Sequence, residues 1–318
     1  MKVRNLSLDL LKVLMAFMVV ALHGNFLKDI SPLGHYLTVN GVFRIAVPVF
    51  FLINGYYFVS ILETGKLIHW TKRVVYLYAL WMLFYAYFWF RPGTFTVNEL
   101  MKIVEAILVG HQHLWYLNAM LGAGFLTFFV QNKSKLGVIL ATICYFWGVL
   151  IQYIGNYHVF PETIVDQIFN MYWAHRNFLF FGFPFFYLGY LINNNNLFSK
   201  NSTFTLVLLF LFGLGLLVGE SWYNFNNPFS NGGFDNYISL IFVCPVLFII
   251  AMRGTLRINS KFFTLISTAI YLIHPLWKQV LYKFLNLENT QLTLACLFFS
   301  IITSYLLIRL NENFKFIL

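Results

Sequence analysis

Charged side chains are scarce in this sequence. Lys, Arg, Asp and Glu together make up 10% of the 318 residues, and only 11 residues are acidic. Ordinary soluble domains carry about 25% charged residues. A chain with so little ionic surface does not stay in water as a compact particle or as a disordered coil. The composition therefore excludes soluble, fibrous and intrinsically disordered proteins.

Cysteine is scarce as well. Cys144, Cys244 and Cys296 each lie inside an apolar run, which excludes a disulfide scaffold. The N-terminus resembles a secretion signal but lacks a small-residue cleavage site, so we expect an uncleaved first helix. No internal repeat is visible, and this disfavours a transporter built from inverted repeats.

Apolar residues are abundant instead. They form 60% of the chain, Phe alone occurs 38 times, and the mean hydropathy is +0.72. Windows of about 20 apolar residues can cross a bilayer as helices. We predict an all-α polytopic membrane protein, one integral membrane domain over residues 1–318, with about ten transmembrane helices. The windows are 6–27, 42–62, 72–90, 114–131, 136–154, 177–193, 203–219, 237–252, 263–284 and 291–310.

The net charge of +10 comes mostly from short basic clusters between apolar runs. Such clusters mark cytoplasmic loops beside an anionic leaflet. With both termini in the cytoplasm, Lys and Arg in the cytoplasmic loops outnumber those outside. We therefore predict cytoplasmic termini, a multi-pass protein of a bacterial inner or plasma membrane, the lipid bilayer as partner, and no binding of nucleic acid.

Three polar residues interrupt the first apolar window. Asp9 and Lys12 are three residues apart, close enough to pair on one helical face. His23 follows Lys12 by 11 residues, so it shares that face about 16 Å further along the axis. Ionisable groups at membrane depth are costly and mark functional sites. The alternative is that Asp9 and Lys12 reach the interface and that His23 only ends the helix.

At these residues the sequence resembles the membrane-bound acyltransferase-3 family, and within it the surface-polysaccharide O-acetyltransferases. The first helix of the family carries an aspartate, a basic residue and a histidine at this spacing. Lys12 stands where Arg is usual, and Asn54 stands where Ser is usual. The other matching segments, in the family's order, are residues 44–58, 72–73, 113–117, 180–190 and 270–275.

The resemblance implies transfer of an acetyl or similar acyl group from cytoplasmic acyl-coenzyme A to a hydroxyl of a surface or lipid-linked glycan. It implies His23 and His113 as catalytic residues. An imidazole titrates near neutral pH, so it can act as a general base or become acylated as a nucleophile. Both routes stay open. Acetyl-coenzyme A is expected as a substrate, with no bound cofactor.

The remaining site residues are assigned by charge and by position. Fixed positive charge suits both the developing oxyanion and the coenzyme phosphates. We expect Asp9, Lys12, Arg44 and Asn54 to support the catalytic site, Lys72 and Arg73 to bind acyl-coenzyme A, and Trp115 and Tyr116 to bind the acceptor. No metal site is expected, although His111 lies two residues before His113. His274 is expected to pack in the core or to cap a helix.

Two other functions compete with the acyltransferase. A polysaccharide exporter or small-molecule transporter would also have about ten spans with buried polar groups. A purely structural subunit would not explain Lys12 and His23 on one helical face. The ordered polar motifs favour the enzyme.

Overall fold

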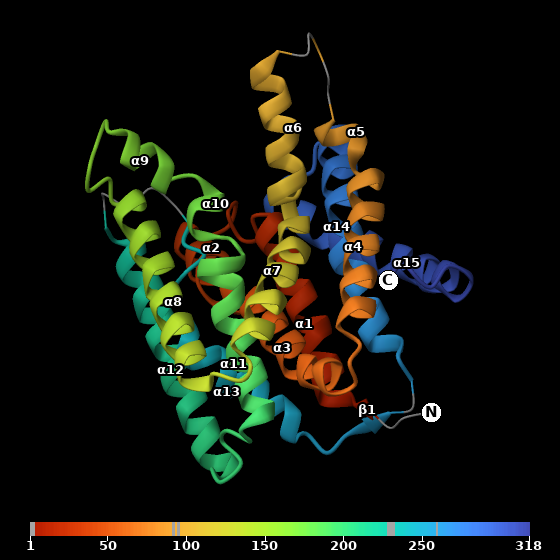
Figure 1. Cartoon of the computed structure of the whole chain (residues 1–318). Coiled ribbons are helices and arrows are strands. Elements are labelled where there is room, and N and C mark those ends of the chain that lie inside the picture. The colour runs from red at the N-terminus through yellow and green to blue at the C-terminus, as the bar shows by residue number, and fades with distance from the viewer. Residues whose placement is uncertain (1–3, 91–92, 94–95, 228–232, 259) are drawn as a thin grey trace.

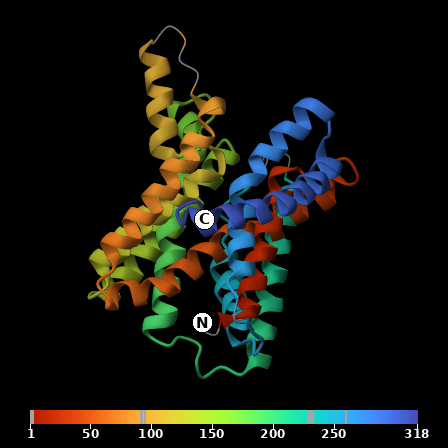
Figure 2. The same cartoon turned by 90° about the vertical axis from the view of Figure 1, so that its right-hand side faces the viewer.

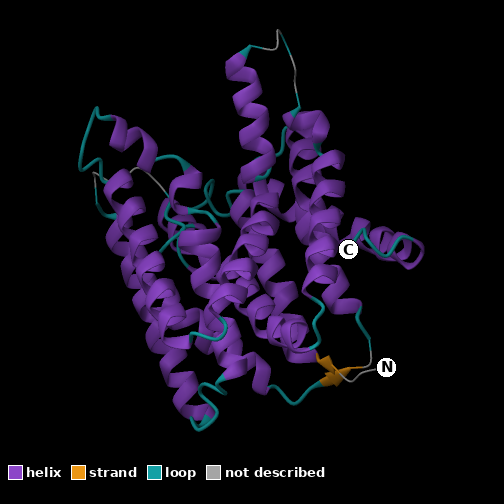
Figure 3. Ribbon diagram, in the orientation of Figure 1, coloured by secondary structure: helices purple, strands orange, loops and turns teal. Residues whose placement is uncertain are grey.

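The computed structural model describes residues 4–90, 93, 96–227, 233–258 and 260–318, and most of them are helical (Figure 3). A helix lies in each of the ten apolar windows. These helices are α1 (Leu6–His23), α3 (Ala46–Glu63), α4 (Leu67–Phe84), α7 (Trp115–Val130), α8 (Ser134–Asn156), α11 (Phe183–Asn194), α12 (Thr203–Phe225), α13 (Leu240–Arg253), α14 (Phe262–Leu285) and α15 (Asn289–Asn313).

Helix length and composition bear out a helical membrane protein. Within the described residues, six helical segments are long and apolar enough to cross a bilayer, and α11 and α13 are shorter apolar helices. The six segments contain α1, α3, α7, α8, α12 and α15. The total of ten spans and the cytoplasmic termini remain predictions. Below, the inner side is the side that holds the N-terminus in Figure 1, and the outer side is opposite.

Several short helices connect the long ones. They are α2 (Pro32–Val39), η1 (Val42–Ile45), α5 (Ala86–Trp89), α6 (Val97–Val109), η2 (Gln112–Leu114), α9 (Ile164–Phe169), α10 (Tyr172–His175) and the π-helical turn η3 (Phe178–Gly182). The windows missed α6 because it has 13 residues and carries charges. A capping box of Thr96 and Glu99 starts α6, which projects beside α4 on the outer side (Figures 1 and 2).

Helices α3 and α11 pack closely because glycine faces backbone on both. A Cβ atom on Gly55 would lie 1.8 Å from the carbonyl oxygen of Phe186, and one on Gly189 would lie 2.1 Å from that of Leu52. Small residues let helices approach closely in membranes, where packing replaces the hydrophobic effect. This contact fixes α3, which carries Asn54 and follows Arg44.

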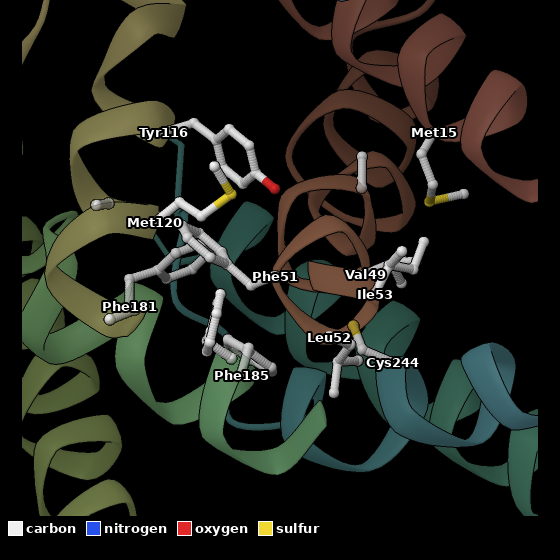
Figure 4. Close-up of a cluster of buried hydrophobic side chains, with 14 of the residues drawn as sticks. Met15, Val49, Phe51, Leu52, Ile53, Tyr116, Met120, Phe181, Phe185 and Cys244 are labelled. Carbon is white, nitrogen blue, oxygen red and sulfur yellow. The ribbon is translucent and has the colours of Figure 1, made fainter. Parts of the chain in front are cut away.

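The core at this contact is aromatic. Phe51 on α3 is fully buried, and its ring lies 4.6 Å from that of Tyr116 and 6.1 Å from that of Phe181, centroid to centroid. Figure 4 shows these rings with Met120 and Phe185 between α3, α7 and α11. These ring contacts hold Tyr116, at the start of α7, and Phe181, in η3, against Phe51. The start of α7 is thereby aligned with α3.

A two-stranded antiparallel pair closes the inner side. β1 (Arg4–Asn5) pairs with β2 (Arg257–Ile258), with Arg4 opposite Ile258. The side chain of Asn5 also donates to the carbonyl of Met252 at 2.7 Å. These bonds join the start of α1 to the connection between α13 and α14. They place Arg4 beside the polar groups of both helices.

The α3–α11 contact predicts the effect of adding one methyl group. Gly55→Ala and Gly189→Ala should each destabilise the protein by about 1–3 kcal/mol, because backbone atoms must move. Gly215→Ala on α12 is the control, since its Cβ would have no atom within 4 Å. Thermal unfolding in detergent measures the difference. Equal melting temperatures in all three variants would contradict the packing.

Candidate active site

Three histidines from distant parts of the sequence meet on the outer half of the molecule. His23 ends α1, His113 lies in η2 just before α7, and His274 lies within α14. The ring of His274 stacks on His23 at 5.3 Å and meets His113 edge-on at 5.2 Å, between centroids. We call these residues the histidine cluster. The structure brings the two predicted histidines together through a third one.

Pro275 fixes the protonation pattern of His274. Proline has no backbone N–H, so the carbonyl of Tyr271 has no donor from within the helix. Nδ1 of His274 lies 2.7 Å from this carbonyl oxygen. Because a carbonyl only accepts, Nδ1 carries the proton. The neutral ring then has an unprotonated Nε2, which is buried and has no partner among the described residues.

Aromatic rings hold His113 in place. The His113 ring lies 5.6 Å from that of Tyr85 and 5.2 Å from that of Tyr271, and the residue is 2% exposed. The Tyr271 hydroxyl donates to the His113 carbonyl at 2.6 Å. Neither ring nitrogen of His113 has a hydrogen-bond partner in the described part of the chain. Buried polar atoms are normally paired, so both nitrogens are suited to a substrate.

A cavity of about 340 Å³ extends from the inner side toward this cluster, but none of the three histidines lines it. Lys12 and Arg73 line it near the inner ends of α1 and α4. Asn54, Tyr116 and Tyr271 line it further in, and the Tyr271 ring is the one that contacts His113. Most of the other lining residues are apolar. The cavity therefore joins positive charge at its inner end to the Tyr271 ring that contacts His113.

A buried ion pair holds Lys12 at the cavity. Nζ of Lys12 lies 3.1 Å from Asp9, which is 1% exposed. The same carboxylate accepts from Arg4 at 3.1 Å and from the Thr264 hydroxyl at 2.6 Å. A buried carboxylate with this many donors is stabilised, because its charge is paired. The predicted pairing of Asp9 with Lys12 is thus present, and it extends to α14.

Asn54 and Tyr116 form a polar pair on the wall of the cavity. The Asn54 amide donates to the Phe50 carbonyl at 2.9 Å and to the Tyr116 hydroxyl oxygen at 2.7 Å. Since this hydroxyl oxygen accepts from Asn54, its own proton is available to a group in the cavity. Tyr116 therefore faces the same space as Lys12, although we expected it to bind the acceptor.

On the outer side, Asp235 lies beside basic residues from two segments, Arg44 in η1 and the adjacent pair His175 and Arg176. Its carboxylate accepts a hydrogen bond from Arg44, lies 3.4 Å from the Arg176 guanidinium and lies 4.0 Å from Nε2 of His175. Burial opposes its charge, but Arg44 and Arg176 outweigh burial and lower the pKa of Asp235 to about 2. Gln152 accepts from its backbone N–H at 2.8 Å. Asp235 stays ionised at all physiological pH values.

The other predicted residues divide between these places. Lys72 and Arg73 are both exposed, and of the two only Arg73 lines the cavity. Arg44 and Trp115 lie on the outer side, where Trp115 contacts Arg176. Among the described residues, no three side chains are arranged to hold a metal ion. Sequence reasoning missed His274 as a site residue, although the proline directly after it marks a carbonyl in need of a donor.

His175 makes the outer side sensitive to acid. Burial lowers the pKa of His175 to about 4, although Asp235 opposes the shift. Because its unfolded value is about 6.5, the unfolded chain binds more protons between pH 6.5 and 4. Stability should therefore fall as pH drops through this window. His175→Gln should flatten that fall in apparent melting temperature, and identical pH profiles for both proteins would contradict the assignment.

Comparison with known proteins points to one family. A family model described as an acyltransferase domain matches residues 5–309. The chain is 27% identical to an amino-acid racemase of Enterococcus faecalis over 99% of its own length and 47% of that protein. It is 29% identical to a serine/alanine racemase of Enterococcus gallinarum over 86% of its own length and 40% of that protein.

The chain spans less than half the length of these curated relatives. No solved structure matches it significantly. The acyltransferase match covers the whole membrane bundle, from β1 to the last turns of α15. It also includes the histidine cluster and the cavity. The chain therefore belongs to the acyltransferase-3 family.

Proposed function

We propose that this acyltransferase moves an acetyl or similar acyl group from cytoplasmic acyl-coenzyme A to a hydroxyl of a surface or lipid-linked glycan. The observation that carries the proposal is a cavity with Lys12 and Arg73 at its inner end, whose wall includes Tyr271, the ring that contacts His113. The donor and the acceptor come from opposite sides of the membrane, so each needs its own path to the same catalytic groups. The cavity serves the donor and the outer side serves the acceptor.

The cavity suits an acyl-coenzyme A donor. Lys12 and Arg73 at its inner end offer positive charge to the phosphates, and its apolar wall suits the long, uncharged pantetheine arm. Arg73 can form forked hydrogen bonds with phosphate. Lys72 is its exposed neighbour and adds charge at the cytoplasmic surface. The thioester then lies near Tyr116 and Tyr271.

The reaction needs one proton to move. As the acceptor oxygen attacks the thioester carbonyl, its O–H bond breaks and an imidazole takes the proton. The C–S bond then breaks, the ester forms, and the coenzyme leaves as a thiol after taking up a proton. We assign the base to His23 and place His113 on the donor side. The acyl-imidazole route remains the alternative, with His23 or His113 as nucleophile.

His274 and Tyr116 have different parts in this proposal. The Nδ1 proton of His274 is held by the Tyr271 carbonyl, so a proton cannot pass through both ring nitrogens. His274 is therefore a positioning residue for the rings on either side. Tyr116 donates its free hydroxyl proton to the carbonyl oxygen of the thioester as negative charge develops there.

Two competing activities need to be tested: racemisation, from the names of the relatives, and export of glycan. Relatives more than twice this chain's length are named racemases. Conversion of L-serine or L-alanine to the D enantiomer by the purified chain would favour racemisation over our proposal. Movement of glycan across vesicles without acyl transfer would favour an exporter.

The histidine cluster predicts a graded set of losses. His23→Ala and His113→Ala should each lower acyl transfer about 10²–10⁴-fold, with normal abundance in the membrane. His274→Asn keeps a donor for the Tyr271 carbonyl and should act more mildly. Acyl transfer to glycan in membranes measures all three. If His23→Ala keeps near-normal transfer and His113→Ala has none, the catalytic role belongs to His113.

The cavity predicts a separate effect on the donor. Arg73→Gln should raise the KM for acetyl-coenzyme A roughly tenfold, since a charged hydrogen bond contributes about 1.5–3 kcal/mol. Lys72→Gln should raise it less, and the double variant should raise it most. The kcat should change little in each case. An unchanged KM in the double variant would mean that both residues only mark the cytoplasmic side and do not bind the donor.

A further inference from the structure

The segment that follows α15 folds back onto α4. We call residues 314–318 the tail segment, and it lies beside α4 where C is marked in Figures 1 and 2. The indole N–H of Trp81 donates to the Ile317 carbonyl at 3.0 Å, and Nη2 of Arg73 donates to the main-chain oxygen of Leu318 at 3.3 Å. Both donors belong to α4. Two side chains of one helix therefore hold the tail segment.

The tail segment is attached mainly through one buried side chain. Phe314 and Phe316 are each 51% exposed, whereas Leu318 is 4% exposed. Leu318 packs in the main hydrophobic core and lines the cavity. Segments with few buried apolar contacts open locally at a low cost in free energy. The tail segment can therefore leave the cavity while the helices stay folded.

Leu318 lies where the donor is expected. Because its main-chain oxygen contacts Arg73, Leu318 is at the basic end of the cavity. Arg73 is the residue that we assigned to the phosphates of acyl-coenzyme A. The pantetheine arm has to pass this point to reach Tyr116 and Tyr271 further in. The tail segment and the donor therefore need the same guanidinium and adjoining space.

Phosphate is a stronger ligand for Arg73 than the tail segment is. The bond from Arg73 to Leu318 is 3.3 Å long, which exceeds the usual limit of about 3.2 Å for an N–H···O bond. Hydrogen bonds between charged partners are roughly twice as strong as neutral ones, and phosphate accepts two at once from a guanidinium. Arg73 is exposed, so a ligand can reach it from the inner side. A bound donor would thus replace the contact with Leu318.

We infer that the tail segment is an autoinhibitory plug, in which Leu318 fills part of the cavity and occupies Arg73, so that acyl-coenzyme A binds only after the tail segment leaves. The inference rests on the proposed function for the identity of the donor. The contacts between the tail segment and α4 are independent of that function. The alternative is that Leu318 is a fixed part of the cavity wall and helps to bind the donor. The two roles predict opposite effects when Leu318 is shortened.

Binding of coenzyme A without an acyl group tests the inference in the absence of turnover. Isothermal titration of the purified protein in detergent measures the dissociation constant. Leu318→Ala removes most of the buried side chain, and Trp81→Phe removes the N–H bound to Ile317 without changing a residue that lines the cavity. Each variant should bind about tenfold more tightly if roughly nine molecules in ten hold the tail segment in the cavity. Phe316→Ala, at an exposed position of the same segment, should bind like the unchanged protein.

Hydrogen exchange gives a second readout of the same step. The N–H groups of Ile317 and Leu318 donate to the Phe314 carbonyl at 3.2 Å and to the Asn311 side chain at 3.1 Å. Saturating coenzyme A should make both amides exchange faster, because a released segment is open to water. A fixed wall residue would instead be covered by the ligand, and its amide would exchange more slowly.

The outcomes separate the inference from the proposed function. Tighter binding in either variant, together with faster exchange, supports the plug. Unchanged or weaker binding in both Leu318→Ala and Trp81→Phe would overturn it, and so would an exchange rate that stays constant or falls with coenzyme A. The proposed function then stands, since coenzyme A still binds. If coenzyme A binds to none of these proteins, the donor assignment fails and the inference fails with it.

Discussion

The site depends on one missing N–H group. Pro275 interrupts the hydrogen-bond ladder of α14 and leaves the Tyr271 carbonyl without a helical donor. His274 fills this position with Nδ1, which fixes both the orientation and the tautomer of its ring. His23 and His113 pack on the fixed ring from two sides. A helix that would otherwise be weakened at this point thus becomes the support for the proposed chemistry.

Two carboxylates, one on either side of this centre, are each paired with cations. Asp9 joins Arg4, Lys12 and Thr264 on the inner side, and Asp235 joins Arg44 and Arg176 on the outer side. Each carboxylate is paired with two cations from different segments of the chain. Ionised groups away from water need such partners. The pairs leave a surplus of one positive charge on each side, and the surplus on the inner side suits the anionic donor that we propose.

Much of this was predictable from sequence, and the reasons are specific. Helices form where about 20 apolar residues follow one another, so all ten windows contained one, while the 13-residue α6 was too short and too charged to register. Asp9 and Lys12 pair because their spacing along one helix dictates it. Contacts between distant segments were not predictable. Nothing in spacing places His274 between His23 and His113, or Asp235 beside Arg176, because those meetings depend on how the helices pack.

The most direct test asks whether transfer runs between the two sides of the membrane. Inverted vesicles, which expose the cytoplasmic face, are prepared from cells that contain the protein and the glycan acceptor. Acetyl-coenzyme A with a labelled acetyl group is added outside. We expect labelled glycan inside the inverted vesicles. In right-side-out vesicles we expect no labelled glycan until detergent opens them. Equal labelling in both kinds of sealed vesicle, or label only in right-side-out ones, would contradict a cytoplasmic donor cavity joined to an outer acceptor site.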